Sequence, residues 1–229
     1  MYKKKQFSSL SKKYSSYQDT GSVGMMMEIC HKNLEENKLV QSLSKNSIIL
    51  EIGAGSSPHL KYLQHSYKKY FFLENSIFSI NHLKKKYKEN KKIYYKYYKN
   101  KKIPFKNNYF DRIIISHVLE HISDPEFYLD QMFKKLKKNG LMSIALPSDP
   151  GLLWRLGRFF LKIFKVKQQL KISKTEYDYM IATEHINSIF NLLSIIRFKY
   201  NKKIISEEYL PFKIRLLDLN LFYNVTIKK

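Results

Sequence analysis

The segment 48–58 constrains the fold of this chain most, because a short apolar run opens directly into a glycine-containing turn. The run Ile48-Ile49-Leu50-Glu51-Ile52 is followed by Gly53-Ala54-Gly55-Ser56-Ser57-Pro58. Continuous apolar runs of this kind are typical of strands buried in a parallel sheet. Glycines after such a strand let the backbone turn sharply and approach a ligand closely. The segment therefore predicts a strand over 48–52 and a nucleotide-type site at its carboxyl end.

The residues after this turn, 59–67, predict a helix whose first turn would offer free backbone N–H groups to a ligand. Pro58 suits the first position of a helix, although it stands where a full dinucleotide-binding fingerprint has its third glycine. The alternative is an ordinary strand-to-helix turn in which the glycines serve backbone geometry alone.

Strand and helix patterns alternate along the following residues, which predicts βαβ units, a parallel sheet and helices on both of its faces. Residues 1–45 are expected to form an N-terminal arm, over 1–22, and a helix, over 25–39. Residues 46–229 are expected to form one α/β domain. The remaining predicted strands are 70–73, 93–95, 110–116 and 141–146, and the remaining predicted helices are 76–87 and 124–136.

The composition restricts location and partners. No run of 18 apolar residues occurs, so no membrane-spanning helix is expected, and Cys30 has no second cysteine for a disulfide or a cysteine-based metal site. The basic start of the chain is followed by no apolar segment, so we expect no secretory signal and a cytoplasmic location.

The formal net charge of +23 would favour anionic partners. However, only five of the basic residues are arginines, the residue that groove and phosphate readers usually favour. A chain rich in Lys, Asn, Ile and Tyr is also what an AT-rich genome produces. We therefore do not expect nucleic acid to be the partner.

Polar residues follow two of the predicted strands at the edge where ligands of parallel α/β sheets bind. Glu74 and Asn75 follow the strand over 70–73, and Ser116 and His117 follow the run 110–115. Glu74 lies about 20 residues beyond the glycine turn, a place where an acidic side chain can accept hydrogen bonds from both ribose hydroxyls. Its alternative role is that of an exposed carboxylate at a strand end.

Five motifs occur in an order and spacing that resemble class I S-adenosylmethionine-dependent methyltransferases, in particular the ubiquinone-biosynthesis-like branch, and the resemblance covers residues 48–150. They are Glu51-Ile-Gly-Ala-Gly, Glu74, Ile103-Pro-Phe followed by Phe110-Asp, Ser116-His-Val-Leu-Glu-His121, and Leu136-Lys-Lys-Asn-Gly140. The later segments 147–151, 184–187 and 218–222 look like a bacterial subgroup of this class.

The resemblance implies a Rossmann-like, seven-stranded, mostly parallel sheet with an antiparallel hairpin, over 202–207 and 221–227, as its last two strands. It implies S-adenosyl-L-methionine as the cofactor. Gly53, Ala54 and Gly55 would pass its amino-acid part, Glu74 and Asn75 would lie at the ribose, and Ser116 and His117 would form the floor beneath the methyl group. Glu51 would support the glycine turn or reach the methionine ammonium. No acidic residue follows the strand over 93–95, so Asn100 or a backbone carbonyl would contact the adenine.

An oxygen or nitrogen nucleophile can require a general base, and four residues are candidates. We place His121 and His185 first, and Glu184 and Asp149 after them. Each has a structural alternative: Glu120 and His121 could cap the next helix, His185 could cap a helix over 187–198, and Asp149 could serve the turn 147–151.

The group His117, Glu120, His121 and His185 also invites a metal interpretation, because two imidazoles and a carboxylate can bind a divalent ion. Small-RNA 2′-O-methyltransferases look similar here, with Glu, Glu-His and a later His, but this chain has His117 where they have the first Glu. We expect no obligatory metal and assign the group to packing, capping and proton transfer.

Residues 151–182 are predicted to form a helical lid inserted after the fifth strand. A helix over 151–172 would be strongly amphipathic, with basic residues opposite its apolar face and Trp154 near its start. Such a helix fits the interface of an anionic membrane, so the protein would be peripheral at the inner membrane face. The alternative is a lid that packs its apolar face on its own domain. The apolar residues are Leu152, Leu153, Leu156, Phe159, Phe160, Ile163 and Phe164.

These features together predict an S-adenosylmethionine-dependent methyltransferase that acts on an oxygen or nitrogen atom of a small-molecule, saccharide or lipid-linked acceptor. Two alternatives remain open. The first is an RNA methyltransferase, which the charge and the His/Glu group favour. The second is a nucleotide-binding protein that retained the fold and lost methyl transfer.

Overall fold

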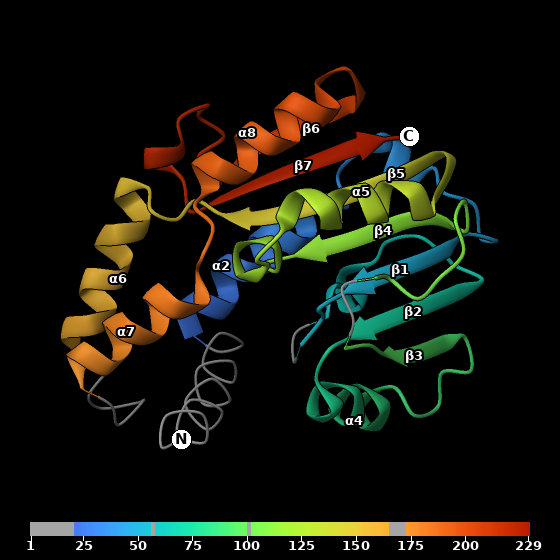
Figure 1. Ribbon diagram of the computed structural model, residues 1–229, viewed down its shortest axis with the longest axis horizontal. Helices are drawn as coiled ribbons and strands as arrows, with labels where there is room; N and C mark the ends of the chain where they lie inside the picture. The colour runs from blue at the N-terminus through green and yellow to red at the C-terminus, as the bar shows by residue number, and fades with distance from the viewer. Residues whose placement is uncertain (1–20, 56–57, 100–101, 165–172) are drawn as a thin grey trace.

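Seven strands form one sheet in the computed structural model, which describes residues 21–55, 58–99, 102–164 and 173–229 (Figure 1). The strand order is β3-β2-β1-β4-β5-β7-β6. β1 pairs in parallel with β2 and β4, whereas β7 runs antiparallel to both β5 and β6. This topology confirms the predicted Rossmann-like sheet with an antiparallel hairpin at its end. The bounds are β1 Ile48–Ile52, β2 Lys69–Glu74, β3 Ile93–Tyr97, β4 Phe110–Ser116, β5 Leu136–Pro147, β6 Ile204–Leu210 and β7 Phe222–Lys228.

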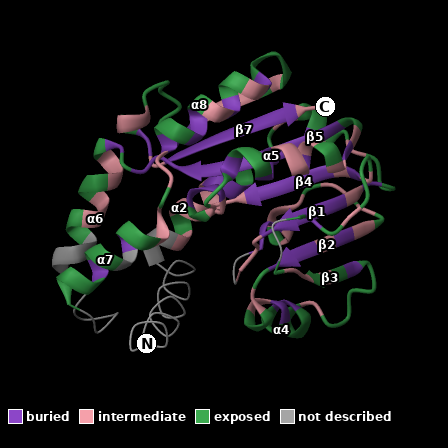
Figure 2. Ribbon diagram, in the orientation of Figure 1, coloured by how far each residue is buried: buried purple, intermediate pink, exposed green. Residues whose placement is uncertain are grey.

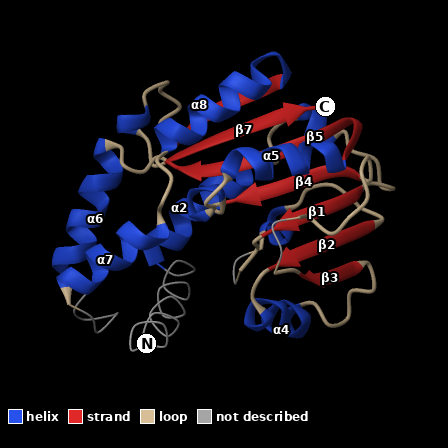
Figure 3. Cartoon of the chain, viewed as in Figure 1, coloured by secondary structure: helices blue, strands red, loops and turns tan. Residues whose placement is uncertain are grey.

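Helices cover both faces of the sheet, as the alternating pattern predicted (Figure 3). Neighbouring residues of a strand point to opposite faces, so Ile49 and Leu50 belong to two different hydrophobic clusters. The cluster containing Leu50 includes residues of α5 (Pro125–Lys135) and α8 (Ile189–Tyr200). The cluster containing Ile49 includes residues of α2 (Gly21–Asn33) and α4 (Ile77–Lys86). The central strands are therefore buried on both sides (Figure 2).

The predicted strand over 48–52 matches β1, and the predicted strand over 110–116 matches β4. β5 begins earlier than expected, at Leu136, because Leu136 pairs with Phe110 directly after α5 ends. The register shifts before Leu141, and Asn139 in the irregular stretch has a left-handed φ of +64°. A Cβ on Gly140 would lie 3.1 Å from the carbonyl oxygen of Phe110, so close packing between β4 and β5 favours glycine there.

The predicted helix over 59–67 is wrong. Only one 3-10 turn, η1 (His59–Tyr62), follows the glycine turn, and Pro58 precedes it in an extended conformation with ψ of 144°. The backbone N–H of His59 donates to the buried Glu51 carboxylate, and that of Gln64 donates to Glu35. These tertiary bonds satisfy backbone groups that a helix would otherwise use. The residues 63–68 then lead without a helix into β2.

The predicted N-terminal helix over 25–39 is divided into α2 and a short α3 (Lys38–Gln41), whose first turn is capped by the side chain of Asn37. The side chain of Asn224 on β7 donates to the carbonyl oxygen of Cys30 and to Asn33, at 2.8 and 2.9 Å. α2 is thereby fixed on the sheet. The predicted arm over 1–22 lies outside the described residues except for its last two.

α6 (Leu152–Phe164) and α7 (Lys174–Glu184) follow β5 and stand beyond the sheet edge to which the arrowheads of β1, β4 and β5 point (Figure 1). Ser173 begins α7 with a reciprocal capping box to Glu176. The predicted lid position is therefore occupied by helices, although residues 165–172 of the predicted helix lie outside the described part. In the described ranges, no helix has the length and apolarity needed to cross a membrane.

Candidate cofactor and acceptor site

The glycine turn after β1 has a left-handed backbone at both of its glycines. Gly53 has φ of +69° and Gly55 has φ of +56°, a region that residues with a side chain rarely adopt. A Cβ on Gly53 would lie 2.5 Å from Cγ2 of Val118, so the turn also packs tightly on the loop after β4. Within the part of the chain that the structure describes, a Cβ on Gly55 would meet no heavy atom within 4 Å. The turn therefore faces open space at Gly55.

Glu74, at the end of β2, lies against this turn. Its Oε1 accepts a hydrogen bond from the backbone N–H of Gly55 at 2.8 Å. Burial raises the pKa of Glu74 to about 7, although hydrogen bonds from the N–H groups of Gly55 and Ala54 oppose the rise. Asn75 follows it and is exposed, while Asn100, the proposed adenine contact, lies outside the described residues. The glycine turn and Glu74 are thus brought together as predicted.

Glu51 lies beneath the turn rather than in the open space. Its side chain is buried, Oε1 accepts the N–H of His59 at 2.6 Å, and Oε2 accepts the hydroxyl of Tyr70 at 2.5 Å. Burial raises the pKa of Glu51 to about 7. Of the two predicted roles, support of the turn therefore fits this geometry, because both carboxylate oxygens are already occupied.

Ser116 and His117 lie at the end of β4. The hydroxyl oxygen of Ser116 and Nε2 of His117 are buried and have no hydrogen-bond partner within the described residues. His117 has a left-handed φ of +55°, which turns the chain out of the sheet. Burial, together with the charges of His185 and His121, lowers the pKa of His117 to about 3, so the imidazole is neutral at physiological pH.

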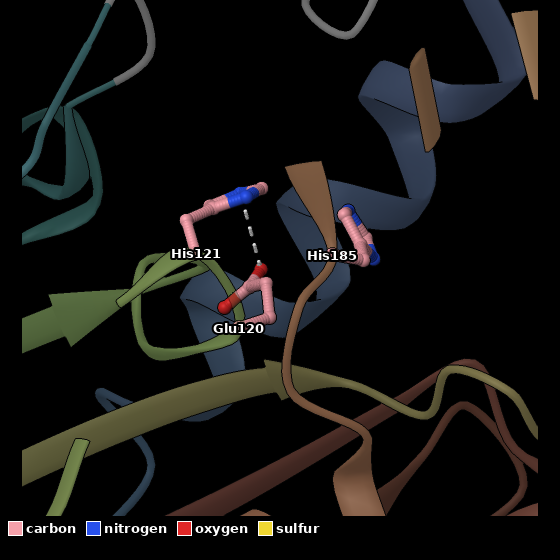
Figure 4. Close-up of side chains that lie close together, drawn as sticks. All are labelled: Glu120, His121 and His185. Atoms are coloured by element: carbon pink, nitrogen blue, oxygen red, sulfur yellow. Dashed lines mark ion pairs between the residues drawn. The ribbon is translucent and has the colours of Figure 1, made fainter. Parts of the chain in front are cut away.

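A group of three side chains lies next to this strand end (Figure 4). Glu120 and His121 belong to the 3-10 turn η2 (Leu119–His121), and His185 follows α7. Nε2 of His121 lies 3.8 Å from Oε1 of Glu120, and the rings of His121 and His185 meet edge to face with centroids 5.0 Å apart. The two histidines predicted as catalytic are therefore brought together.

Hydrogen bonds donated by Nδ1–H set the tautomers of both histidines. Nδ1 of His121 lies 2.7 Å from the carbonyl oxygen of Glu184, and Nδ1 of His185 lies 2.7 Å from Oδ2 of Asp149. Both partners accept hydrogen bonds, so each Nδ1 carries the proton and each neutral ring keeps an unprotonated Nε2. The alternative capping roles are wrong, because Asp124 caps α5 and Ser188 caps α8.

Asp149 also binds Arg158 of α6 through a salt bridge to Oδ2. Burial raises the pKa of Asp149, but the hydrogen bond from His185 and the charge of Arg158 outweigh burial and lower it. Trp154 lies between Arg158, 5.7 Å from its ring, and His185, whose ring stacks on it at 6.4 Å. The start of α6 is therefore anchored at the site by Arg158 and Trp154.

The loop after α7 is fixed to η2. The backbone N–H of Ile186 donates to the carbonyl oxygen of Glu120 at 2.9 Å, and the side-chain amide of Asn187 donates to that of Leu119 at 2.9 Å. The segment 184–187, singled out in the sequence, thus serves to hold His185 beside His121. Glu184 contributes its carbonyl oxygen to this arrangement.

Residues 27–198, more than half of the chain, match the family described as a methyltransferase domain. The chain belongs to this methyltransferase family. Comparison of the sequence with curated proteins gives no significant match. The family assignment confirms the resemblance and makes S-adenosylmethionine the cofactor of this fold. It leaves the subgroup and the acceptor open.

Solved structures similar to this methyltransferase share its fold at low sequence identity. A SAM-dependent methyltransferase from Aquifex aeolicus is 15% identical with a TM-score of 0.60, covering 97% of each chain. The N-methyltransferase NodS from Bradyrhizobium japonicum WM9, in complex with S-adenosyl-L-homocysteine, is 13% identical with a TM-score of 0.62, also covering 97% of each chain. The cyclase SpnF is 12% identical with a TM-score of 0.59, covering 87% of this chain and 79% of its own.

The residues of this methyltransferase fit the cofactor. The open space beside Gly55 leaves room for a ligand that approaches the backbone, and Glu74 is a carboxylate suited to ribose hydroxyls. The unpartnered Ser116 hydroxyl and His117 Nε2 supply further polar atoms at the same edge.

A buried network near the glycine turn was not predicted from the sequence. Arg112 on β4 is fully buried and donates to Glu35 at 2.5 Å and to Ser143 at 3.0 Å. The same carboxylate of Glu35 also binds the ring of His59. Burial raises the pKa of Glu35, but His59 and Arg112 outweigh it and hold it at about 2. The signal in the sequence was an arginine inside the apolar run 110–116, because a charge buried there requires a partner.

Proposed function

We propose that this methyltransferase transfers a methyl group from S-adenosylmethionine to an oxygen or nitrogen atom of a small-molecule, saccharide or lipid-linked acceptor. The observation that carries the proposal is the position of two fixed imidazoles, His121 and His185, beside the strand end that also bears Ser116 and His117. The bound cofactor supplies an electrophilic methyl group on its sulfonium. The protein therefore has to align the acceptor with that methyl group and handle one proton.

The residues proposed to bind the cofactor lie at the carboxyl ends of the parallel strands. Gly53, Ala54 and Gly55 are proposed to pass the amino-acid part, because their backbone borders the open space. Glu74, with Asn75 next to it, is proposed to hold the ribose, and Glu51 is proposed to fix the turn from below. Ser116 and His117 are proposed as the floor under the methyl group. Asn100 remains proposed for the adenine.

The proton is proposed to leave through a histidine. His185 resembles a general base oriented by a carboxylate, because its Nδ1–H is fixed by Asp149 and its Nε2 is unprotonated in the neutral ring. His121 has the same arrangement with a carbonyl oxygen in place of the carboxylate. As the acceptor oxygen or nitrogen attacks the methyl carbon, its proton passes to one of these Nε2 atoms. The electrons of the broken C–S bond stay on sulfur.

The surface of α6 supports an amphiphilic acceptor. Leu152, Leu156 and Phe159 are 45%, 44% and 56% exposed, so this stripe is not packed on the domain. Arg155 is exposed as expected, whereas Arg158 turns inward to Asp149. The side chains of 161–164 lie outside the described part, and with them Ile163 and Phe164 of the predicted apolar face.

The loop between β6 and β7 adds to this surface beside α6. The N–H of Leu152 donates to Asp218 of that loop at 2.8 Å. The loop carries further exposed apolar side chains, Phe212, Ile214, Leu216 and Leu219, together with Lys213 and Arg215. Apolar and basic residues in this combination support peripheral contact with an anionic membrane.

The transfer is tested with cofactor carrying a radioactive methyl group. The purified protein is incubated with fractionated bacterial extract, and label is counted in the lipid, RNA and small-molecule fractions. Label that moves to the organic phase, and is lost with Glu74→Ala, supports a lipid-linked acceptor. Label that ribonuclease releases would favour the RNA alternative, which the +23 net charge keeps open. Cofactor binding without any transfer would favour the second alternative, a nucleotide-binding protein of the same fold that does not catalyse methyl transfer.

A further inference from the structure

The group Glu120, His121 and His185 has a composition that a general base alone does not explain. One potential ligand atom from each residue lies within 4.8 Å of the others. Oε2 of Glu120 is buried and has no hydrogen-bond partner within the described residues. We infer that Glu120, His121 and His185 bind a divalent transition-metal ion, which holds oxygen atoms of the acceptor. The role toward the acceptor rests on the proposed function, whereas the metal site itself does not.

The distances suit an ion that draws the three groups together. With metal–ligand bonds of about 2.0–2.2 Å, two ligand atoms of one ion are separated by at most about 4.4 Å. No two of the three ligand atoms are more than 4.8 Å apart, and Nε2 of His121 lies 3.8 Å from Oε1 of Glu120, so small shifts bring all three within reach of one ion. The side chain of His121 is 39% exposed, which leaves the ion a route from solvent.

The hydrogen bonds around the histidines are those that metal-binding imidazoles make. A ligating histidine usually donates its other ring N–H to a carboxylate or a backbone carbonyl, which fixes the tautomer and the ring orientation. His185 donates to Asp149, and His121 donates to the carbonyl oxygen of Glu184. Both Nε2 atoms therefore keep a free electron pair for a cation.

The charges of the surrounding groups also allow a cation. Arg158 lies 3.4 Å from Nδ1 of His185, and its charge is paired with Asp149. The imidazoles of His117 and His121 each lie 3.8 Å from Oε1 of Glu120. Two imidazoles and a carboxylate favour ions from Mn²⁺ to Zn²⁺ over Mg²⁺, which prefers oxygen ligands.

Three protein ligands leave coordination positions for the acceptor, which favours an acceptor with neighbouring hydroxyl or carboxylate oxygens. A cation next to an acceptor hydroxyl lowers the pKa of that hydroxyl. The proton passes to water, the oxygen attacks the methyl carbon, and the C–S electron pair remains on sulfur. The products are the methyl ether, S-adenosylhomocysteine and one proton. In this arrangement His121 and His185 act as ligands instead of free bases.

The test measures metal binding directly on the untagged, chelator-treated full chain. Co²⁺ is titrated while its visible absorption is recorded, and Zn²⁺ and Mg²⁺ are titrated by calorimetry. We expect one Co²⁺ or Zn²⁺ per chain and much weaker binding of Mg²⁺. Glu120→Gln and His185→Gln should remove the absorption bands. Asp149→Asn should weaken the affinity by about 10–100-fold, because the second hydrogen bond of a ligating histidine contributes on that scale.

The control is His82→Gln, which removes an exposed histidine of α4 and should leave metal binding unchanged. Binding of S-adenosylhomocysteine is measured on the same samples, so that a misfolded variant is recognised. Absence of Co²⁺ bands in a chain that binds S-adenosylhomocysteine overturns the metal site and leaves the proposed function intact. Equal metal affinity in Glu120→Gln and His82→Gln also overturns it. Metal binding without S-adenosylhomocysteine binding would instead contradict the proposed function.

Discussion

The backbone N–H of Gly55 donates to the carboxylate of Glu74 at 2.8 Å, across two neighbouring strand ends. The two residues belong to β1's turn and to β2, so the bond fixes the position of the carboxylate relative to the glycine turn. A cofactor whose amino-acid part and ribose occupy these two places therefore meets a geometry that exists before it binds. The first two predictions test the two sides of this bond.

Glu74→Ala should weaken the binding of S-adenosylmethionine by about 1–3 kcal/mol, because a buried polar contact to the ribose hydroxyls is lost. Titration calorimetry measures the change. Glu89→Ala, at a carboxylate with an 87% exposed side chain, is the matched control and should bind normally. Unchanged affinity in Glu74→Ala would remove Glu74 from the site.

The two glycines of the turn should respond differently to substitution. Gly55→Val should abolish cofactor binding because the side chain fills the space of the ligand. Its φ of +56° should cost some stability, but the fold should be kept because a Cβ there meets no described atom within 4 Å. Gly53→Ala should destabilise the protein itself, since its Cβ would lie 2.5 Å from Val118.

Circular dichroism, thermal unfolding and calorimetry separate the two effects. Gly157→Ala on α6, also without a neighbour within 4 Å, is the control for an added methyl group. Normal cofactor affinity in folded Gly55→Val would contradict the placement of the turn.

Glu51 should make the protein less stable as the pH rises. Folding raises the pKa of Glu51 from 4.5 to about 7, so as the pH rises the unfolded chain releases this proton before the folded chain does. The stability that the protonated side chain contributes is fully present below pH 4.5 and is lost as the pH rises to about 7. A shift of this size corresponds to about 3 kcal/mol. Glu51→Gln removes the titrating group and nearly conserves its volume. Denaturant unfolding at pH 5 and pH 8 should therefore show a smaller loss in Glu51→Gln than in the natural sequence. Equal losses would show that Glu51 is ionised throughout this range.

Phe159→Glu should weaken sedimentation with anionic vesicles, because the 56% exposed ring belongs to the apolar stripe of α6. Phe198→Glu is the matched control, since Phe198 is 90% exposed on α8, away from this stripe. Binding should also fall with added salt, because each basic residue near the lipid contributes about 1 kcal/mol and acts over about 10 Å at 0.1 M salt. If both substitutions act alike, the attraction is diffuse charge, and the lipid-linked acceptor loses its support.

Much of the sheet was predictable because each strand has a pattern of apolar residues that are consecutive in the sequence. The apolar runs of β1 and β4 gave their bounds, and the glycines gave the turn. The segment 59–67 was not predictable in this way, because the bonds of Glu51 and Glu35 to its backbone come from elsewhere in the chain. A local sequence pattern does not indicate which residues outside it will form hydrogen bonds with its backbone.

The same distinction applies to the site. The residue types at the strand ends were predicted, since their place in the sheet follows from the strand order. The orientation of His185 was not, because Asp149, which fixes it, lies 36 residues away in the sequence and was considered as a base or a turn residue. The pairing of Arg112 with Glu35, 77 residues apart, was missed for the same reason.

The bonds between α2 and β7 bear on the order in which the domain is completed. Cys30 and Asn224 are separated by 194 residues, so α2 leaves the ribosome long before the strand to which it binds. Until that strand emerges, the carbonyl of Cys30 has only the N–H of Leu34 among its two described donors, and the side-chain oxygen of Asn33 lacks the amide of Asn224. A truncation that stops before 224 would leave this end of α2 without its partner. α2 and β7 are thus completed together, although they are far apart in the sequence.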